Sequence, residues 1–242
     1  MMKPFSSNAH AIIVALICAS SIAACTSSAM PGPSNPGSNP LPGPTSQPQN
    51  CSQSATPTPS MNLCLVTGFK IALVSNNVSN ARFLAFAPNG DLIVSEPNNG
   101  AVVAIPPGSA VNAAPNIIAS GLSRPHGLAF NGNDLYIGTQ TGLSVIRNYP
   151  TNTTVQTLYS GLPQPNNDHN NRSLAIASNG TVYLSSGSDC NICSESDAKY
   201  ATIMSMDLNG QNAQIYASGV RNGSGLAFDQ SGQLWMVVNQ RD

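Results

Sequence analysis

Charged residues are scarce in this 242-residue sequence. Asp, Glu, Lys and Arg together make up 8% of it, against about a quarter in an ordinary soluble domain. Nine Lys and Arg stand against ten Asp and Glu, so the net charge is close to zero. Such a chain has no field that would concentrate a polyanion. We therefore expect no nucleic-acid partner, and a ligand that is small or neutral.

Several enzyme motifs are also absent. The sequence has no G-x-S-x-G nucleophile motif, no H-E-x-x-H zinc motif, no Walker phosphate loop and no G-x-G-x-x-G. If the protein is a redox enzyme, its cofactor is therefore not a nicotinamide bound in the Rossmann manner.

The first 60 residues predict export and tethering rather than a folded core. Residues 1–25 combine Lys3 with an apolar run that is too short to span a bilayer stably and that ends in "SIAAC". This ending resembles a bacterial lipobox, which predicts a lipoprotein signal peptide and a lipid on Cys25; plain secretion and a retained anchor are the alternatives. Residues 26–60 are rich in Pro, Ser and Gly and predict an extended tether.

These features predict the location of the protein. Thr26, rather than Asp, follows the lipobox Cys, which by resemblance favours the outer membrane. We expect a lipid-anchored protein that faces the periplasm or the cell surface and is attached to the membrane through lipid only. Residues 61–242 form the folded part.

Four further cysteines, Cys51, Cys64, Cys190 and Cys193, suggest disulfides in an exported protein. Cys190 and Cys193 lie in "CNIC", which favours a local disulfide; metal binding and redox chemistry are the alternatives. Zinc would need two more good ligands nearby. Pairing of Cys51 with Cys64 is the remaining combination.

The most informative feature is an internal repeat. Each copy has a short apolar segment, a turn built on Asn-Gly, Gly-Asn or Ser-Gly, and an alternating apolar segment, which together predict a β-hairpin. The copies are residues 82–96, 126–140, 172–186 and 224–238, and their equivalent residues Phe86, Phe130, Ile176 and Phe228 lie 44, 46 and 52 residues apart.

A period near 45 residues with several short strands is typical of the blades of a β-propeller. The fold class is therefore all-β, with about four blades in this chain. Propellers usually close a ring of four to eight blades, and residues 70–242 hold fewer than four full periods. We therefore expect the chain to be truncated at its C-terminus relative to a longer parent.

Polar and charged residues gather just before each hairpin. The position six residues before the equivalent apolar residue holds Asn80, Arg124, Asn170 and Asn222. The position seven residues before it holds Ser79, Ser123, His169 and Arg221, and the position four before it holds Arg82, His126, Arg172 and Ser224. Equivalent loops of successive blades converge around the channel of a propeller, so we expect a polar site there, with His126 and Arg172 as candidate channel-lining residues.

Other roles are open for these side chains. A loop histidine such as His126 is often simply exposed or hydrogen-bonded. Arg82, Arg124 and Arg172 could equally form ion pairs within or between blades. His169 is the stronger candidate, because Asp168 and Arg221 are predicted to lie near it and could set its tautomer and pKa.

The order of several segments resembles one enzyme family. "RPHGLAF", "DHNNRSLAIASNGTVYLSSGSDCNICSE", "KYATIMSMDLNG", "IYASGVRNGSGLAF" and "GQLWMVVNQRD" are similar to the soluble pyrroloquinoline quinone (PQQ) dependent sugar dehydrogenases of the glucose/sorbosone dehydrogenase type. The similarity runs from about residue 65 to the last residue. It implies a β-propeller of the six-bladed sugar dehydrogenase type.

The resemblance also implies residue roles. His169 matches the family's base, which removes the proton of the sugar hydroxyl while a hydride passes to the quinone, and Asp168 would orient it. Arg221 and Asn222 match cofactor-binding residues. Calcium in relatives lies near the segment matching residues 238–242, and the metal ligands of this chain stay unknown. The family's basic contacts from later blades have no counterpart within residues 1–242.

We therefore expect PQQ-dependent oxidation of an aldose or sugar aldehyde, with PQQ and calcium as cofactors and a sugar and an electron acceptor as partners. Two alternatives stay open: a non-catalytic exported propeller that binds carbohydrate or protein, and a metal-dependent lactonase-like propeller. A lactonase would need Glu, Asp and Asn ligands on one metal, and Glu96 is the only Glu near a predicted channel-facing strand end.

Overall fold

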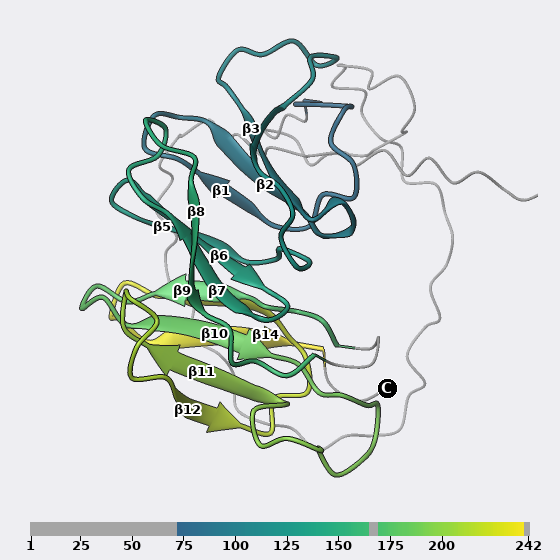
Figure 1. Cartoon of the computed structure of the whole chain (residues 1–242), viewed down its shortest axis with the longest axis vertical. Helices are drawn as coiled ribbons and strands as arrows, with labels where there is room; N and C mark the ends of the chain where they lie inside the picture. Colours follow the sequence, from purple (N-terminus) through teal and green to yellow (C-terminus); the bar gives the residue numbers. More distant parts are fainter. Residues whose placement is uncertain (1–71, 165–168, 240–242) are drawn as a thin grey trace, which may run out of the picture. The chain divides into compact units, whose positions relative to one another are not determined.

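The computed structural model describes residues 72–164 and 169–239, and the described residues from Ser75 onward belong to one compact unit. Their regular structure consists of β-strands and one turn of 3-10 helix, η1 (Pro97–Asn99). The strands build four antiparallel sheets that follow one another along the chain (Figure 1).

The first three sheets have four strands each, hydrogen-bonded in chain order. The first sheet holds β1 (Leu84–Phe86), β2 (Leu92–Glu96), β3 (Ala101–Ile105) and β4 (Asn116–Ala119). The second holds β5 (Leu128–Asn131), β6 (Asp134–Thr139), β7 (Gly142–Ile146) and β8 (Val155–Tyr159). The third holds β9 (Leu174–Ile176), β10 (Val182–Ser186), β11 (Thr202–Met206) and β12 (Gln214–Ser218), and the fourth holds β13 (Gly223–Phe228) and β14 (Leu234–Val238).

Each sheet begins with the hairpin that the sequence repeat predicts: β1–β2, β5–β6, β9–β10 and β13–β14. The Asn-Gly turns have the expected backbone, since Gly90 and Gly180 have φ angles of 90° and 85°, a left-handed conformation that glycine adopts without steric cost. The β-propeller fold is confirmed, with three four-stranded blades and the first hairpin of a fourth in the described residues.

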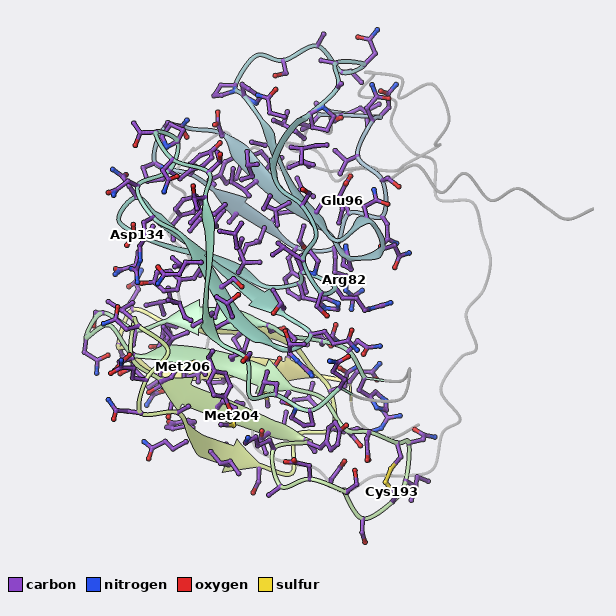
Figure 2. All side chains as sticks on the ribbon, viewed as in Figure 1. Arg82, Glu96, Asp134, Cys193, Met204 and Met206 are labelled. Carbon is purple, nitrogen blue, oxygen red and sulfur yellow. A yellow bond between two sulfur atoms is a disulfide. The ribbon has the colours of Figure 1, made fainter. Side chains whose placement is uncertain are left out.

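Two apolar cores join neighbouring sheets. Ile93, Val102 and Leu135 belong to the core between the first and second sheets. Leu184 and Met204 belong to the core between the second and third, where Figure 2 labels Met204. Middle strands such as β2, β3 and β7 are buried along their whole length. For β7 the reason is that the first and third sheets pack on its two faces, since Ile146 belongs to one core and Val145 to the other.

Polar contacts also link the sheets. The Tyr149 hydroxyl, in the connection between β7 and β8, donates to Asp91 Oδ2 of the first sheet at 2.6 Å in a buried contact. Tyr136 Oη and Arg147 Nη2 both donate to the Leu208 carbonyl beyond β11, each at 3.1 Å. The relative placement of the sheets is therefore fixed by directional bonds as well as by apolar packing.

The first strands of successive sheets lie next to one another: β1 contacts β5, β5 contacts β9, and β9 contacts β13. Gly127 shows how close this approach is, since its N–H donates to the Arg172 carbonyl at 2.9 Å and a Cβ there would lie 2.4 Å from that oxygen. The loops that lead into these strands are thus brought together.

The predicted signal peptide, lipidated Cys25, the tether, Cys51 and Cys64 lie outside the described residues, so these stay predictions. Across residues 72–164 and 169–239, the structure has no helix of the length and apolarity needed to cross a membrane.

Candidate functional site

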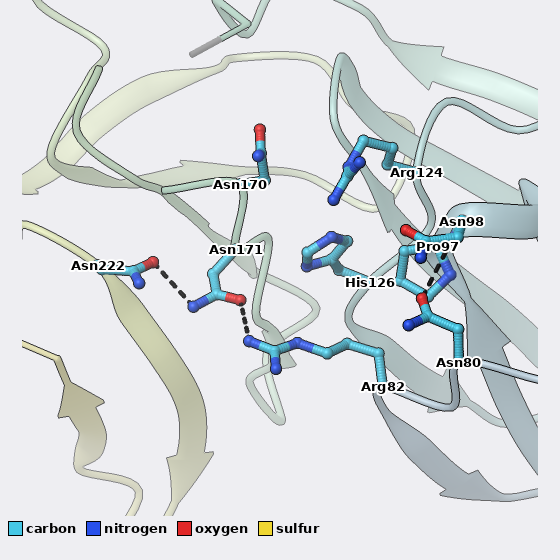
Figure 3. Close-up of a pocket in the computed structure, with 9 residues that line it drawn as sticks. All are labelled: Asn80, Arg82, Pro97, Asn98, Arg124, His126, Asn170, Asn171 and Asn222. Atoms are coloured by element: carbon cyan, nitrogen blue, oxygen red, sulfur yellow. Dashed lines mark hydrogen bonds between the residues drawn. The ribbon is translucent and has the colours of Figure 1, made fainter. Parts of the chain in front are cut away.

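The loops before the first strands meet at a pocket of about 270 Å³, which we call the asparagine pocket. All four sheets contribute: Asn80, Arg82, Pro97 and Asn98 belong to the first, Arg124 and His126 to the second, Asn170 and Asn171 to the third, and Asn222 to the fourth (Figure 3). The four residues that stand six positions before the equivalent apolar residues are all in this lining. The repeat register therefore converges on one pocket.

The asparagine pocket is lined by amides and cations, and no described carboxylate is among its lining residues. Ion pairing was one of the roles open for Arg82 and Arg124. Among described residues, however, the single ion pair joins Arg147 to Asp134 at 2.7 Å. The pocket therefore carries local positive charge in a chain whose net charge is −1, and this favours a ligand with negative charge.

A chain of hydrogen bonds crosses the pocket. Arg82 Nη2 donates to Asn171 Oδ1 at 2.7 Å, and Asn171 Nδ2 donates to Asn222 Oδ1 at 2.8 Å (Figure 3). Residues preceding β1, β9 and β13 are thereby joined. Each of these loops leads into a different sheet, so the chain fixes the positions of the three loops relative to one another.

His126 is buried in the wall of this pocket, with 4% of its surface exposed. Neither ring nitrogen has a hydrogen-bond partner in the described part of the chain. Burial, followed by the charges of Arg82, Arg124 and Arg172, lowers the pKa of His126 to about 3, while the Asn171 amide acts in the opposite direction. The ring is therefore neutral near pH 7, with one donor and one acceptor nitrogen.

His169, the predicted base, is 8% exposed and precedes the pocket-lining Asn170 without itself lining that pocket. Its Nδ1 lies 3.2 Å from the Ser188 carbonyl oxygen. A carbonyl only accepts, so Nδ1 carries the proton of the neutral ring and Nε2 keeps its lone pair. Asp168 lies outside the described residues, and its predicted role toward His169 stays a prediction.

Arg221 and Asn222 were both predicted to bind the cofactor, and in the structure they line different pockets. Asn222 lines the asparagine pocket, whereas Arg221 lines a second pocket of about 360 Å³ beside the β10–β11 loop. Arg221 Nη1 donates to the Asn239 carbonyl at 3.3 Å, and Nη2 donates to Asn191 Oδ1. Asn222 thus lines the asparagine pocket together with His126, whereas Arg221 does not.

Arg172 was expected to line the channel together with His126, and the structure differs. It is fully buried, at 0% exposure, and is absent from the lining of the asparagine pocket. Its guanidinium donates to the backbone carbonyls of Gln140, Asn171 and Pro163, at 3.1, 3.0 and 2.8 Å. Burial lowers the pKa of Arg172 to about 10, which leaves it charged at neutral pH as a structural link between loops.

Cys190 and Cys193 form a disulfide within the β10–β11 loop, drawn as the yellow bond in Figure 2. Asp189 lies close to both sulfurs, but sulfurs joined in a disulfide are not thiolates and do not offer a metal site. The loop also holds Asn191, which contacts Arg221. Cys193 and Asn191 both line the second pocket, so the disulfide belongs to its wall.

Sequence reasoning missed Asn171, Pro97 and Asn98 as pocket residues. The positions equivalent to Asn171 in the other repeats hold Ala81, Pro125 and Gly223, so the repeat gave no sign of a polar role there. Pro97 and Asn98 belong to η1, between β2 and β3, and no part of the repeat pattern singles out that connection.

Comparison with solved structures finds related propellers. The PQQ domain of pyranose dehydrogenase from Coprinopsis cinerea has a TM-score of 0.65 and 21% identity, over 77% of this chain and 50% of that chain. The PQQ-bound aldose sugar dehydrogenase of Streptomyces coelicolor gives 0.53 and 17%, over 67% and 57%. The calcium structure of a family AA12 carbohydrate-active enzyme from Trichoderma reesei gives 0.55 and 20%, over 70% and 48%.

At these identities the structural similarity shows a shared fold, and this chain spans about half the length of the proteins it matches. No match is found among curated proteins. A family model described as TrAA12-like, in contrast, matches residues 63–242. Since that match covers well over half of the sequence, the chain belongs to the TrAA12-like family of PQQ-dependent sugar dehydrogenases.

Proposed function

We propose that this protein takes part in the PQQ-dependent oxidation of an aldose or sugar aldehyde, with PQQ bound at the asparagine pocket. One observation carries the proposal: the loops of four successive sheets converge there on amides, two arginines and a buried unpartnered histidine, with no carboxylate among the described lining residues. Membership of the TrAA12-like family supports it.

The residues of the pocket fit the cofactor. PQQ carries three carboxylates and two quinone oxygens, which accept hydrogen bonds, and the lining offers guanidinium and amide donors. The unpartnered nitrogens of His126 provide a further contact in the wall of the pocket. Asn222, Arg124 and Arg82 would hold the cofactor, and Arg221 would act from the adjoining pocket. We propose calcium as a second cofactor near residues 238–242, of which 240–242 are not described.

The proposed base is His169. When bound, PQQ supplies the acceptor for the hydride of the sugar carbon. His169 would take the hydroxyl proton at Nε2, because the Ser188 carbonyl holds the ring proton on Nδ1 and leaves Nε2 as the acceptor. Asp168 would support the imidazolium that results. Positive charge from the arginines would stabilise negative charge that develops nearby.

A metal-dependent lactonase receives less support. That chemistry needs carboxylates converging on one metal, and Glu96 was the acid nearest the predicted channel. Its Oε1 accepts from the Ser79 backbone N–H at 2.7 Å, and its Oε2 accepts from Asn99 Nδ2 at 3.1 Å. Both oxygens of Glu96 thus hold the loops of the first sheet together.

The remaining parts of the proposal concern partners and location. The electrons would pass to a quinone-linked acceptor or, in vitro, to a dye. The protein would act at the outer membrane, facing the periplasm or the cell surface, anchored by lipid on Cys25. A non-catalytic propeller that binds carbohydrate or protein is the alternative that the next experiment separates.

The test combines PQQ binding with turnover. We expect the purified protein to bind PQQ saturably, seen as a shift of the quinone absorbance, and to reduce a dye in the presence of an aldose. His169→Ala should lower the dye-reduction rate by about a hundredfold or more, the usual contribution of a general base, while PQQ affinity changes by no more than about twofold.

Lys199→Gln is the control, since Lys199 is a cation outside the asparagine pocket whose Nζ donates to the Gly161 carbonyl. It should leave both measurements unchanged. If His169→Ala kept full activity, His169 would not be the base. If the folded protein does not bind PQQ, with or without calcium, the dehydrogenase proposal is wrong and the non-catalytic binding propeller takes its place.

A further inference from the structure

The hydrogen-bond chain across the asparagine pocket has a direction that its first member imposes. A guanidinium has donors only, so the Asn171 atom that Arg82 Nη2 meets at 2.7 Å must be the amide oxygen. The NH₂ group of Asn171 then faces Asn222. The Asn222 atom at 2.8 Å must accept, and is therefore its oxygen.

Asn222 consequently has its oxygen engaged and its NH₂ group available to a ligand in the pocket that it lines. We propose that Asn171 is a positioning residue which, through Arg82, fixes Asn222 as a hydrogen-bond donor toward the bound ligand. An amide side chain alone would present either end, because its two ends have nearly the same shape.

Neighbouring amides follow the same pattern. The oxygen of Asn80 accepts from the Asn98 backbone N–H at 3.4 Å, and the oxygen of Asn170 accepts from Gln140 Nε2 at 3.0 Å. Arg124 has donors only. The four residues of one repeat position therefore offer N–H groups, which suit a ligand face of carboxylate and carbonyl oxygens.

Two properties of Asn171 indicate that its amide positions Asn222 and is not simply required for the propeller to fold. Its side chain is 4% exposed, so water does not compete for its hydrogen bonds. Ala81, Pro125 and Gly223 occupy its position in the other repeats, and these residues have no side-chain hydrogen-bonding group. The propeller thus forms without an amide there, and the amide serves this pocket.

The identity of the ligand as PQQ rests on the proposed function, whereas the orientation of Asn222 does not. Asn171→Asp keeps the shape and the contact to Arg82 but removes the only donor. Asn222 must then turn its NH₂ group to the new carboxylate and present its oxygen to the ligand. We expect PQQ to bind about ten- to a hundredfold more weakly, the loss typical of one donor replaced by an opposing acceptor.

The added negative charge would weaken binding of an anion by itself, so the substitution is also made in an Asn222→Ala background, where no amide remains to turn. There the loss of PQQ affinity should be at least about fivefold smaller, since the cycle isolates the coupling between the two residues. An equal loss of affinity in both backgrounds would show that only charge matters, and would overturn the positioning role.

A ligand-free measurement tests the orientation directly. By NMR of the ¹⁵N-labelled protein, the wild-type NH₂ group of Asn171 should be protected from exchange with water and that of Asn222 should not. In Asn171→Asp the Asn222 group should become protected. A protected Asn222 NH₂ group in the wild type would overturn the inference. The expected pattern together with no PQQ binding would support the orientation and count against the proposed function alone.

Discussion

Burial removes the hydration that stabilises the charged form of a histidine, and His126 is buried in this way close to several arginines. Its pKa falls to about 3, whereas an unfolded chain titrates near 6.5. Below about pH 6.5 His126 therefore binds a proton in the unfolded state but not in the folded state. The free energy of unfolding should decline as the pH falls from 6.5 toward 3, by up to about 1.4 kcal/mol per pH unit from this group.

The test is His126→Gln, which keeps a neutral polar side chain that does not titrate. Urea unfolding between pH 7 and pH 4 should give a shallower loss of stability for the variant than for the wild type, and no difference in slope above pH 7. Parallel slopes below pH 6.5 would mean that the ring takes up its proton in the folded state as well.

The side chains of the site show what sequence could and could not predict at the scale of residues. The repeat register identifies positions of the backbone, so it placed Asn80, Arg124 and Asn222 around one pocket. It carries no information on rotamers. Arg172 holds the same repeat position as Arg82, yet it extends to three backbone carbonyls because the second and third sheets approach closely there.

Among the connecting elements, the loop after β10 packs directly against the predicted base, His169. Gly187 opens this loop, and a Cβ there would lie 2.1 Å from the His169 carbonyl oxygen and 2.7 Å from the His169 Cβ. Gly187→Ala must therefore displace His169. Since misplacement of a catalytic group by about 1 Å costs up to a hundredfold in rate, we expect dye reduction to fall by tenfold or more.

The matched control is Gly225→Ala in β13, where a Cβ would meet nothing within 4 Å. This variant should keep the wild-type rate in the dye assay and the wild-type melting temperature. A Gly187→Ala protein as active as Gly225→Ala would mean that the chemistry does not depend on where His169 lies.

The hairpins were the predictable elements, and the reason is local. Turn residues such as Asn89-Gly90 and the alternating apolar segments lie within a few residues of one another. One short stretch of sequence therefore determines each hairpin. The outer strands β4, β8 and β12 lie outside the repeat that predicts the hairpins, because they are partly exposed and their apolar pattern is weak.

For the whole molecule, the asparagine pocket exists only while the sheets keep their relative positions. The first and second sheets are joined by the bond from the Tyr149 hydroxyl to Asp91 Oδ2, between residues that are 4% and 8% exposed. Tyr149→Phe leaves a buried carboxylate oxygen without this donor while the apolar packing is kept. We expect the free energy of unfolding to fall by about 1–3 kcal/mol.

The control is Tyr183→Phe, because the structure gives the Tyr183 ring two aromatic neighbours, Tyr216 and Phe228, and its hydroxyl no hydrogen bond to a described residue. That variant should stay within about 0.5 kcal/mol of the wild type. Urea unfolding measures both variants, and PQQ titration of the folded Tyr149→Phe protein adds a second result. If the link between sheets holds Asn80 and Arg82 in place, its affinity falls together with its stability. Unchanged affinity would show that the cores between the sheets suffice to keep the pocket in shape.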